Sequence, residues 1–332
     1  MSKKIVILFD LLEAPPPDQN YRDYEKDSVW DNEVSVKRAL QRLGHEVVLI
    51  GVFNDITRLI TELNEIKPDL IFNMVESFNN NRNLEPQVVG VFELLGIPFT
   101  GTRSLGLGIC KDKALSKKIL SHHRIRIPRW VVSHRSRPLR KIHDIKFPAF
   151  VKASHTEGSE GISKESFVES ESDAIARAAF LHEKYESNVI IEEFIEGREL
   201  YMSVLGDKRL QCFPMREIVF QNFPEDEPKF ATYKSKWDEK YRKKWGIRNE
   251  FARNLEKDVI KRAENMCKKA FAVLHLHAYA RFDLRLNEQG ELYMLEANPN
   301  PSITDYDDFA ASGRKADIEY DELIAKLIDL AY

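Results

Sequence analysis

The sequence predicts an α/β protein that continues into an α+β part, and three observations support this. Apolar runs alternate with amphipathic segments over about the first 100 residues, which is typical of a parallel sheet covered by helices. From Lys111 onwards, closely spaced strands and longer polar loops replace that alternation. The chain has 332 residues, a length that commonly forms roughly two or three domains.

The elements of the first part follow from hydrophobic period and end signals. Compact apolar runs predict strands at 4–9, 45–51, 69–75 and 97–100. Amphipathic segments that stop at Gly44, Pro68 and Gly96 predict the helices 31–43, 55–66 and 84–95. The proline-rich and charged segment 11–29 predicts a long loop, which is a candidate lid.

The second part predicts strands joined by turns, with helices between them. The strands expected are 128–132, 147–153, 188–194, 198–205 and 210–220, followed by a hairpin of 278–286 and 291–297. The helices expected are 111–122, 172–185, 251–274 and 317–331. The stretch 221–248 contains KSKWDEKYRKKW and predicts a charged loop, either a mobile lid or a plainly solvated segment.

Composition excludes several classes of protein. Fifty Lys and Arg against 53 Asp and Glu leave a net charge of −3, which argues against a general nucleic-acid binder. No run of about 18 apolar residues is present, so no membrane span is expected. Cys110, Cys212 and Cys267 lie far apart without a CxxC pair, which argues against a disulfide framework and against zinc. The start MSKKIVILFD predicts a strand rather than a signal peptide, and hence a cytoplasmic protein.

The last hairpin carries the strongest candidate site. Its strands read ARFDLRL and ELYMLEAN, and side chains alternate between faces along a strand, so Arg281, Asp283 and Arg285 share one face. If the turn pairs Asn287 with Gly290, Arg281 lies opposite Glu296.

That register places Asp283 opposite Met294, and it projects Asp283, Glu296 and Asn298 from the same side of the hairpin. Two carboxylates and an amide oxygen without histidine suit Mg²⁺. The alternative is a surface ladder of ion pairs through Arg281 and Glu296.

Three separated lysines are candidate phosphate ligands. Lys113 begins a helix after the expected loop 106–110, Lys152 ends a strand before the small-residue loop SHTEGSEG, and Lys236 lies in the charged stretch. Each of them taken singly is also an ordinary surface lysine. Neither GxxxxGK[ST] nor GxGxxG after the first strand is present, which excludes a P-loop and the dinucleotide fingerprint.

The segment IIEEFIEGREL at 190–200 could line an adenosine site. An apolar strand offers flat surface to a base, while Glu192, Glu193 and Glu199 could accept hydrogen bonds from ribose hydroxyls. An ordinary hairpin with exposed acids is the alternative reading.

These pieces together resemble a known family. The ordered motifs are CKDK around Lys113, FPAFVK ending at Lys152, EGS at 157–159, EEFIEGRE at 192–199, TYKSKW around Lys236, RFD at 281–283 and EANPNPSIT at 296–304. The first part adds NEVSV at 32–36, FNMVES at 72–77 and GIPFTG at 96–101. In this order they resemble the ATP-grasp superfamily, and specifically the D-alanine–D-alanine ligases, over nearly the whole chain.

The resemblance implies an ATP-grasp fold of three domains: a parallel α/β domain at 1–110, a central lid domain at 111–200 and a mixed-sheet domain at 201–332. It implies that ATP lies between the last two domains. The residues it assigns to ATP are Lys113, Lys152, Glu192, Glu193, Ile195, Glu199 and Lys236. Its magnesium ligands match Asp283, Glu296 and Asn298, with Mn²⁺ as an alternative ion.

The resemblance also implies the catalytic roles. Arg281 and Lys236 would stabilise the transferring phosphate, Asp31 would lie near the ammonium of the first substrate, and Ser159 would help to orient that substrate. The activity implied is ATP-dependent joining of a carboxylate to an amine through an acyl phosphate. The alternatives are a regulator that binds nucleotide without turnover and a ligase that forms an ester with a hydroxy acid.

Departures from the family pattern fall on the amino-acid pockets. Trp237 replaces an expected tyrosine, Ser302 an expected glycine and Asp307 an expected small hydroxyl residue, with Asp305 and Asp308 nearby. Three acids there would repel a substrate carboxylate, which predicts an amine other than D-alanine. The alternative is that these acids face solvent or cap the next helix. The partners expected are amino acids or small peptides, and a homodimer is left open.

Overall fold

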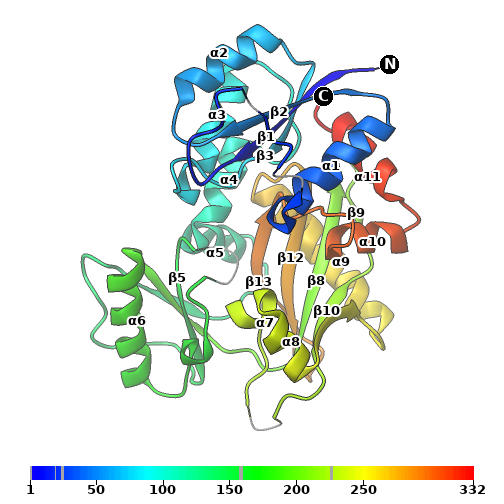
Figure 1. The fold of residues 1–332 in the computed structure, drawn as a ribbon. Coiled ribbons are helices and arrows are strands. Elements are labelled where there is room, and N and C mark those ends of the chain that lie inside the picture. The colour runs from blue at the N-terminus through cyan, green and yellow to red at the C-terminus, as the bar shows by residue number, and fades with distance from the viewer. Residues whose placement is uncertain (1, 19, 24–25, 157–159, 225–226) are drawn as a thin grey trace.

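Three sheets organise the computed structural model, which describes residues 2–332 apart from 19, 24–25, 157–159 and 225–226 (Figure 1). The first sheet has the order β2-β1-β3 and is parallel, with β1 at Lys4–Asp10, β2 at Glu46–Val52 and β3 at Leu70–Met74. All but the two end residues of β1 are buried, which explains its unbroken apolar run. The expected strand at 97–100 makes a single bridge, Ile71 to Phe99.

Helices cover both faces of the parallel sheet. Those of the first part are α1 at Asp31–Arg42, α2 at Ile56–Ile66, α3 at Glu85–Leu95 and α4 at Ser104–Lys111. The sequence prediction of a loop at 106–110 is wrong, because this segment lies within α4. A side chain at Gly106 would meet the carbonyl oxygen of His275 at 2.4 Å, so glycine allows α4 to pack closely.

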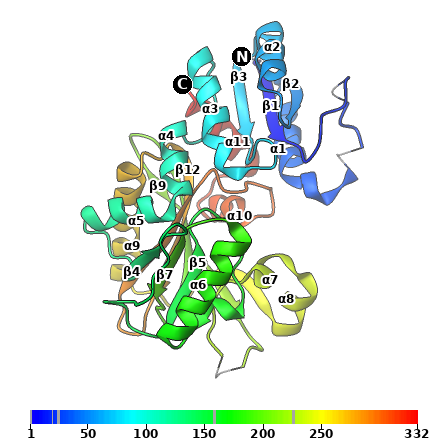
Figure 2. The ribbon, with the colours of Figure 1, turned by 90° about the vertical axis from the view of Figure 1, so that its left-hand side faces the viewer.

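The second sheet is antiparallel, in the order β4-β7-β5-β6, and α6 at Glu171–Tyr185 covers one face of it (Figure 2). Its strands are β4 at Trp130–Ser133, β5 at Ala149–Ala153, β6 at Phe167–Val168 and β7 at Val189–Glu193. The side chain of Ser170 caps α6, and the buried face of α6 packs on Val151 and Ile191.

The third sheet has the order β11-β10-β8-β12-β13, with β9 paired to β8. Its strands are β8 at Arg198–Gly206, β9 at Gln211–Cys212, β10 at Arg216–Phe220, β11 at Ile247–Phe251, β12 at Ala278–Leu286 and β13 at Leu292–Pro299. The sequence predicts a mixed sheet here, whereas every described pair is antiparallel. The expected strand 210–220 is divided into β9 and β10, because Pro214 between them has no N–H to donate.

Two helix groups flank the third sheet. The long helix α9, at Lys257–Val273, shares a core with β8 and β12 on one face. The helices α10 at Asp308–Lys315 and α11 at Tyr320–Asp329 return to the first sheet, where Ile324 and Leu327 join the core of Ile5 and Ile7. The chain ends therefore lie near each other at the top of Figure 1.

From Tyr233 onwards, the charged stretch 221–248 forms helices and a strand instead of the expected loop. It contains α7 at Tyr233–Trp237, α8 at Glu239–Trp245 and the start of β11. Tyr241 and Trp245 pack beside Ile247, so the stretch has apolar anchors that its charge pattern did not indicate. Across the described residues, no helix is both long and apolar enough to cross a membrane.

Candidate active site

A β-bulge in the last hairpin sets the geometry of the site. The turn pairs Leu286 with Leu292, and the register then shifts between Asp283 and Leu284, so that Asp283 pairs with Glu296. The expected register, which paired Arg281 with Glu296, is wrong by two residues. Because a bulge inserts one extra residue, it returns Glu296 to the face of Asp283, which the uninterrupted turn register would not have done.

Three of the four side chains on this face, Arg281, Asp283 and Glu296, are held in ion pairs. The guanidinium of Arg281 donates from Nε to Asp283 Oδ1 at 2.8 Å and from Nη2 to Asp283 Oδ2 at 3.2 Å. Lys113 Nζ lies 3.1 Å from Glu296 Oε1. Asn298 is paired with Arg281 in the sheet, and its buried Nδ2 has no hydrogen-bond partner among the described residues.

The donor set fits a hard divalent cation. Asp283 and Glu296 are directly opposite each other, and the amide of Asn298 follows on the same face. The described residues contain no group of three His, Cys, Asp or Glu that could hold a metal, so the amide would have to complete the set. Burial opposes ionisation of Glu296, but Lys113 and Lys152 lower its pKa to about 2, which keeps it an anionic ligand.

Glu192 is enclosed by two lysines. Lys152 Nζ, on β5, lies 2.7 Å from Glu192 Oε1, and Lys117 Nζ, on α5 at Lys113–His122, lies 2.6 Å from Oε2. The three side chains are at most 7% exposed. Burial opposes ionisation of Glu192, yet the two lysines lower its pKa.

Lys117 is not among the site residues predicted from the sequence, although its spacing from Lys113 could have indicated it. Lys117 lies four residues after Lys113, so both project from the same face of a helix. Asp112 caps that helix by accepting from the backbone N–H groups of Ala114 and Leu115. The helix thus directs Lys113 toward Glu296 and Lys117 toward Glu192.

A cavity of about 70 Å³ lies between the second and third sheets beside these lysines. Its walls include the expected ATP residues apart from Lys113, namely Lys152, Glu192, Glu193, Ile195, Glu199 and Lys236. Aromatic rings make the apolar wall, where Phe230 meets Phe150 and Phe194 edge to face at 5.0 and 6.1 Å. A cavity of this size is below the range of sites that enclose a drug-sized ligand, so a nucleotide would have to widen it.

The expected ATP residues lie on different segments around this cavity. Glu193 accepts at Oε1 from the Lys146 backbone N–H at 3.0 Å. Glu199 is buried, and it accepts from the hydroxyl of Tyr201 and from the backbone N–H of Ala231. Lys236 lies on α7, whose first turn is capped by Thr232.

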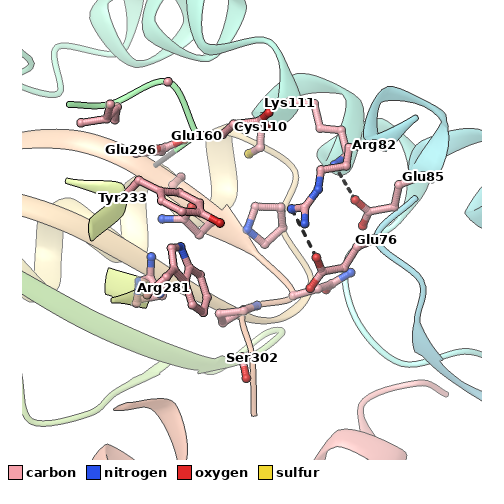
Figure 3. Close-up of a pocket in the computed structure, with 18 of the residues that line it drawn as sticks. Glu76, Arg82, Glu85, Cys110, Lys111, Glu160, Tyr233, Arg281, Glu296 and Ser302 are labelled. Atoms are coloured by element: carbon pink, nitrogen blue, oxygen red, sulfur yellow. Dashed lines mark ion pairs between the residues drawn. The ribbon is translucent and has the colours of Figure 1, made fainter. Parts of the chain in front are cut away.

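A second cavity, of about 1100 Å³, opens beside the first and reaches the first sheet (Figure 3). Its wall includes Arg281, Glu296 and Asn298. These residues also lie on the metal-ligand face, which is the face of the hairpin that carries the candidate ligands Asp283, Glu296 and Asn298. Figure 3 shows Tyr233 and Arg281 on one side, with the ion-paired Glu76 and Arg82 across from them. Because Glu296 lines both cavities, they adjoin each other at this face of the hairpin.

Acidic groups collect where the first sheet meets this cavity. Asp10 ends β1, Glu76 follows β3 and Glu33 lies in the first turn of α1. Burial and the nearby carboxylates of Glu76 and Asp10 raise the pKa of Glu33 to about 7. Sequence reasoning selected Asp31 and missed Glu33, although both stand at the same helix start and close to the carboxyl ends of two strands.

Asp31 itself is turned toward the segment after the hairpin. Its Oδ2 accepts from the hydroxyl of Tyr306 at 2.7 Å, and it is not among the residues that line the large cavity. The neighbouring Asn32 does line that cavity and accepts from the backbone N–H of Ile303. The expected site residue Ser159 lies outside the described residues.

The three aspartates after the hairpin do not line the large cavity. Asp305 pairs with Arg314 at 2.5 Å, and Asp308 pairs with Arg216 at 2.9 Å. Asp307 accepts from Ser302. The structure therefore favours the alternative that these acids serve local structure, and it removes the charge argument against a substrate carboxylate. Trp237 does line the cavity and is 63% exposed, so its bulk remains relevant.

The motif GIPFTG positions the end of the hairpin. Asn300 Oδ1 accepts from the backbone N–H of Thr102 at 2.8 Å. A side chain at Gly101, where φ is +94°, would meet Asn300 Oδ1 at 2.4 Å. The glycine thus allows the first domain to hold the loop that follows Asn298.

Comparison with known proteins gives consistent results. The family described as D-ala D-ala ligase C-terminus matches residues 119–329. The D-alanine–D-alanine ligase B of Clostridium perfringens (strain 13 / Type A) is 30% identical over 244 residues, which cover 73% of this chain and 74% of that protein. The D-alanine–D-alanine ligase of Aquifex aeolicus is 28% identical over 307 residues, covering 92% and 97%.

Solved structures share the fold. The D-alanine–D-alanine ligase of Bacillus anthracis complexed with ATP superimposes with a TM-score of 0.76 at 22% identity, covering 99% of this chain and 97% of the other. The ligase of Coxiella burnetii gives a TM-score of 0.71 at 16% identity, covering 99% and 94%.

Proposed function

The chain belongs to the D-alanine–D-alanine ligase family, and on that premise we propose how its own residues carry out the reaction of an ATP-dependent carboxylate–amine ligase. A carboxylate is a poor electrophile, because its leaving group would be oxide. Transfer of the γ-phosphoryl group of ATP to the carboxylate gives an acyl phosphate, from which phosphate can leave when the amine attacks.

The metal-ligand face would hold Mg²⁺, or Mn²⁺, through Asp283, Glu296 and Asn298. When bound, such an ion neutralises phosphate charge. Both carboxylates are ion-paired without it, so a bound ion would replace Arg281 and Lys113 as their partners. These two cations would then be free to bind phosphate oxygens, Arg281 those of the transferring group and Lys113 those of ATP.

The small cavity takes the nucleoside and the inner phosphates. Its aromatic wall accepts the base, Glu192, Glu193 and Ile195 border the base, and Glu199 accepts from the ribose. Lys152 and Lys236 neutralise phosphate charge, Lys236 from α7 during transfer as well. Lys117 keeps Glu192 ionised when Lys152 turns toward phosphate.

The large cavity takes the amino-acid or peptide substrates. We place the ammonium of one substrate near the acids Asp10, Glu33 and Glu76, since burial and the two neighbouring carboxylates raise the pKa of Glu33 and a cation would favour its ionised form. The roles of Asp31 and Ser159, the domain limits at 110 and 200, a homodimer and the cytoplasmic location stay predictions.

The observation that carries this proposal is the single hairpin face on which Arg281, Asp283, Glu296 and Asn298 meet at the junction of the two cavities. The test is release of inorganic phosphate from ATP and Mg²⁺ with amino acids and dipeptides supplied singly and in pairs. We expect release that depends on a substrate pair, together with a new amide detected by mass spectrometry. ATP binding without release under any pair would instead support a regulator, and release with a hydroxy acid as sole nucleophile would support an ester-forming ligase.

A further inference from the structure

Arg285 is a buried cation at the inner end of the small cavity, and neither the expected ATP residues nor the catalytic set includes it. It is 4% exposed. Its Nη1 donates to the carbonyl oxygen of Gly197 at 3.0 Å, and its Nη2 donates to the carbonyl oxygen of Lys229 at 3.0 Å. Nη2 also lies 3.5 Å from Glu199 Oε2, and the guanidinium carbon lies 5.3 Å from the ring centre of Phe194.

These contacts join two segments, one at 197–199 and one at Lys229, to β12 around one cavity. Gly197 lies in the turn between β7 and β8, Glu199 begins the buried part of β8, and Lys229 precedes the cavity residues Phe230 and Ala231. The turn is tightly packed there, because a side chain at Gly197 would meet the carbonyl oxygen of Leu286 at 2.1 Å. Arg285 therefore fixes the positions of the β7–β8 turn, of Glu199 and of the segment at Lys229 relative to one another.

The position of Arg285 along β12 matches the length of a nucleotide. Arg281, Asp283 and Arg285 alternate onto one face, and a strand advances about 3.4 Å per residue, so about 14 Å separates the first from the last. With Arg281 at the transferring phosphate and Asp283 at the metal, Arg285 falls at the nucleoside end. Its partner across the sheet is Glu199, and the partner of Asp283 is Tyr201.

Glu199 accepts two hydrogen bonds and lies beside one cation. Tyr201 donates to Oε1 at 2.9 Å, and Ala231 N–H donates to Oε2 at 3.3 Å, beside the Arg285 contact. A carboxylate has about four acceptor positions, so Glu199 can accept from a further donor in the cavity. Arg285 is the cation in contact with this buried side chain.

We propose that Arg285 is a positioning residue that orients Glu199 for the ribose hydroxyls of ATP while holding the two backbone segments that close the nucleotide cavity. This inference rests on the proposed function, because it requires ATP in the small cavity. A guanidinium serves both carbonyl oxygens and the carboxylate at once from its planar fork, which a lysine ammonium does not reproduce.

The test measures binding of ATP and of 2′,3′-dideoxy-ATP, each with Mg²⁺, by calorimetry to the full chain. We expect the wild type to prefer ATP, and Arg285→Leu to bind ATP about ten- to hundredfold more weakly, as expected for a lost hydrogen bond to a charged group. The dideoxy nucleotide cannot donate from its ribose, so its affinity should fall much less, and the preference for ATP should shrink. In turnover assays the KM for ATP should rise while the KM for the amino-acid substrate does not.

Two further variants complete the design. Arg198→Leu is the matched control, since Arg198 is also an arginine of the third sheet with a carboxylate pair, to Glu217, and a carbonyl bond, to Arg253, but it does not line the cavity. Its ATP preference should equal that of the wild type. Arg285→Lys keeps the charge and should show an intermediate preference, and it decides the question if Arg285→Leu does not fold.

The outcomes separate the two claims. The role of Arg285 is overturned if Arg285→Leu and Arg285→Lys lose affinity for ATP and for the dideoxy nucleotide by the same factor. It is also overturned if the affinity for both nucleotides is unchanged. Either result leaves the ATP site itself intact. Absence of ATP binding by the wild type overturns the proposed function and the role of Arg285 together.

Discussion

The two cavities differ in how their charges are balanced. Around the small cavity, the carboxylates of the buried Glu192 and Glu199 and of the half-buried Glu296 each have at least one lysine or arginine within 3.5 Å. At the edge of the large cavity, Glu33 has no ion pair among the described residues, and its neighbours Asp10 and Glu76 carry the same charge.

This difference follows from what each cavity would receive. A polyanion such as ATP needs many cations, and these are stable in the free protein only if carboxylates hold them there. A substrate ammonium needs the reverse, an excess of negative charge. On the proposed function, the first cavity would hold its cations in internal pairs that ATP exchanges, and Glu33 beside the second cavity would stay without a cation until a substrate ammonium binds. Three substitutions test this contrast.

The largest effect is expected at the junction of the cavities. Glu296→Gln removes one negative charge from the metal-ligand face and should lower kcat by about a thousandfold, as do losses of preorganised charge at other active sites. Rates of phosphate release at saturating ATP and Mg²⁺ measure it. Glu291→Gln, on the same hairpin but paired with Arg126 at the surface, is the control and should keep its rate. Turnover of Glu296→Gln within about tenfold of wild type would contradict the metal assignment.

The next effect is on stability. Lys117→Met leaves the buried carboxylate of Glu192 with Lys152 as its only close cation, and removal of one partner from a buried pair costs about 3 kcal/mol or more. Lys164→Met breaks an equally short pair, with Glu227, whose side chains are 58% and 36% exposed, and should cost about 0.5 kcal/mol or less. Urea unfolding of both variants without nucleotide gives the comparison. Equal losses would show that the cations of the small cavity are not held by buried pairs.

The same geometry changes an expectation about Lys152. From sequence, Lys152 predicts a nucleotide ligand whose removal leaves the stability of the free protein almost unchanged. Since Lys152 is buried and paired with Glu192, its removal should also lower the free energy of unfolding.

Much of the fold could be predicted from local patterns. The three strands of the first sheet, the helix α6 and the final hairpin have compact apolar runs or a clear amphipathic period with end signals, and these survive in any tertiary context. The ordered lysines and acids could be grouped as one site because the chain resembles a family. Their partners could not, because the pairing of Glu192 with Lys117 joins segments 75 residues apart by a fold that local pattern does not encode.

Other features could not be predicted from the sequence, for physical reasons. The β-bulge at Asp283 adds one residue to a strand, and no particular residue type marks it in the sequence. The predicted register of the hairpin is therefore wrong. The helix α4 contains Gly106 and Gly108, which lower helix propensity, and only Gly106 is required for close packing. The helices α7 and α8 are rich in charge, and only tertiary contact of Tyr241 and Trp245 reveals their apolar face.

The smallest expected effect concerns the carboxyl without a cation. Burial, Glu76 and Asp10 raise the pKa of Glu33 from 4.5 to about 7 in the folded protein. Between these values the folded state holds a proton that the unfolded state has released, so stability falls as pH rises from about 4.5 to about 7 and stays lower above it. The variant Glu33→Gln has no ionisable group at this position, so its stability should not fall in this way as the pH rises.

We therefore expect Glu33→Gln to unfold like the wild type near pH 4.5 and to be more stable by about 1 kcal/mol at pH 8, a part of the linkage limit because Glu33 is only half-buried. The measurement is urea unfolding at both pH values, with Glu65→Gln on the exposed face of α2 as control for the loss of one charge. An amino-acid substrate should reduce the difference in unfolding free energy between variant and wild type at pH 8. Its ammonium stabilises the ionised Glu33 of the wild type, whereas the variant offers an uncharged amide. Equal stability of variant and wild type at pH 8 would mean that the acids at this edge are compensated like those of the small cavity, and the contrast between the two cavities would then be lost.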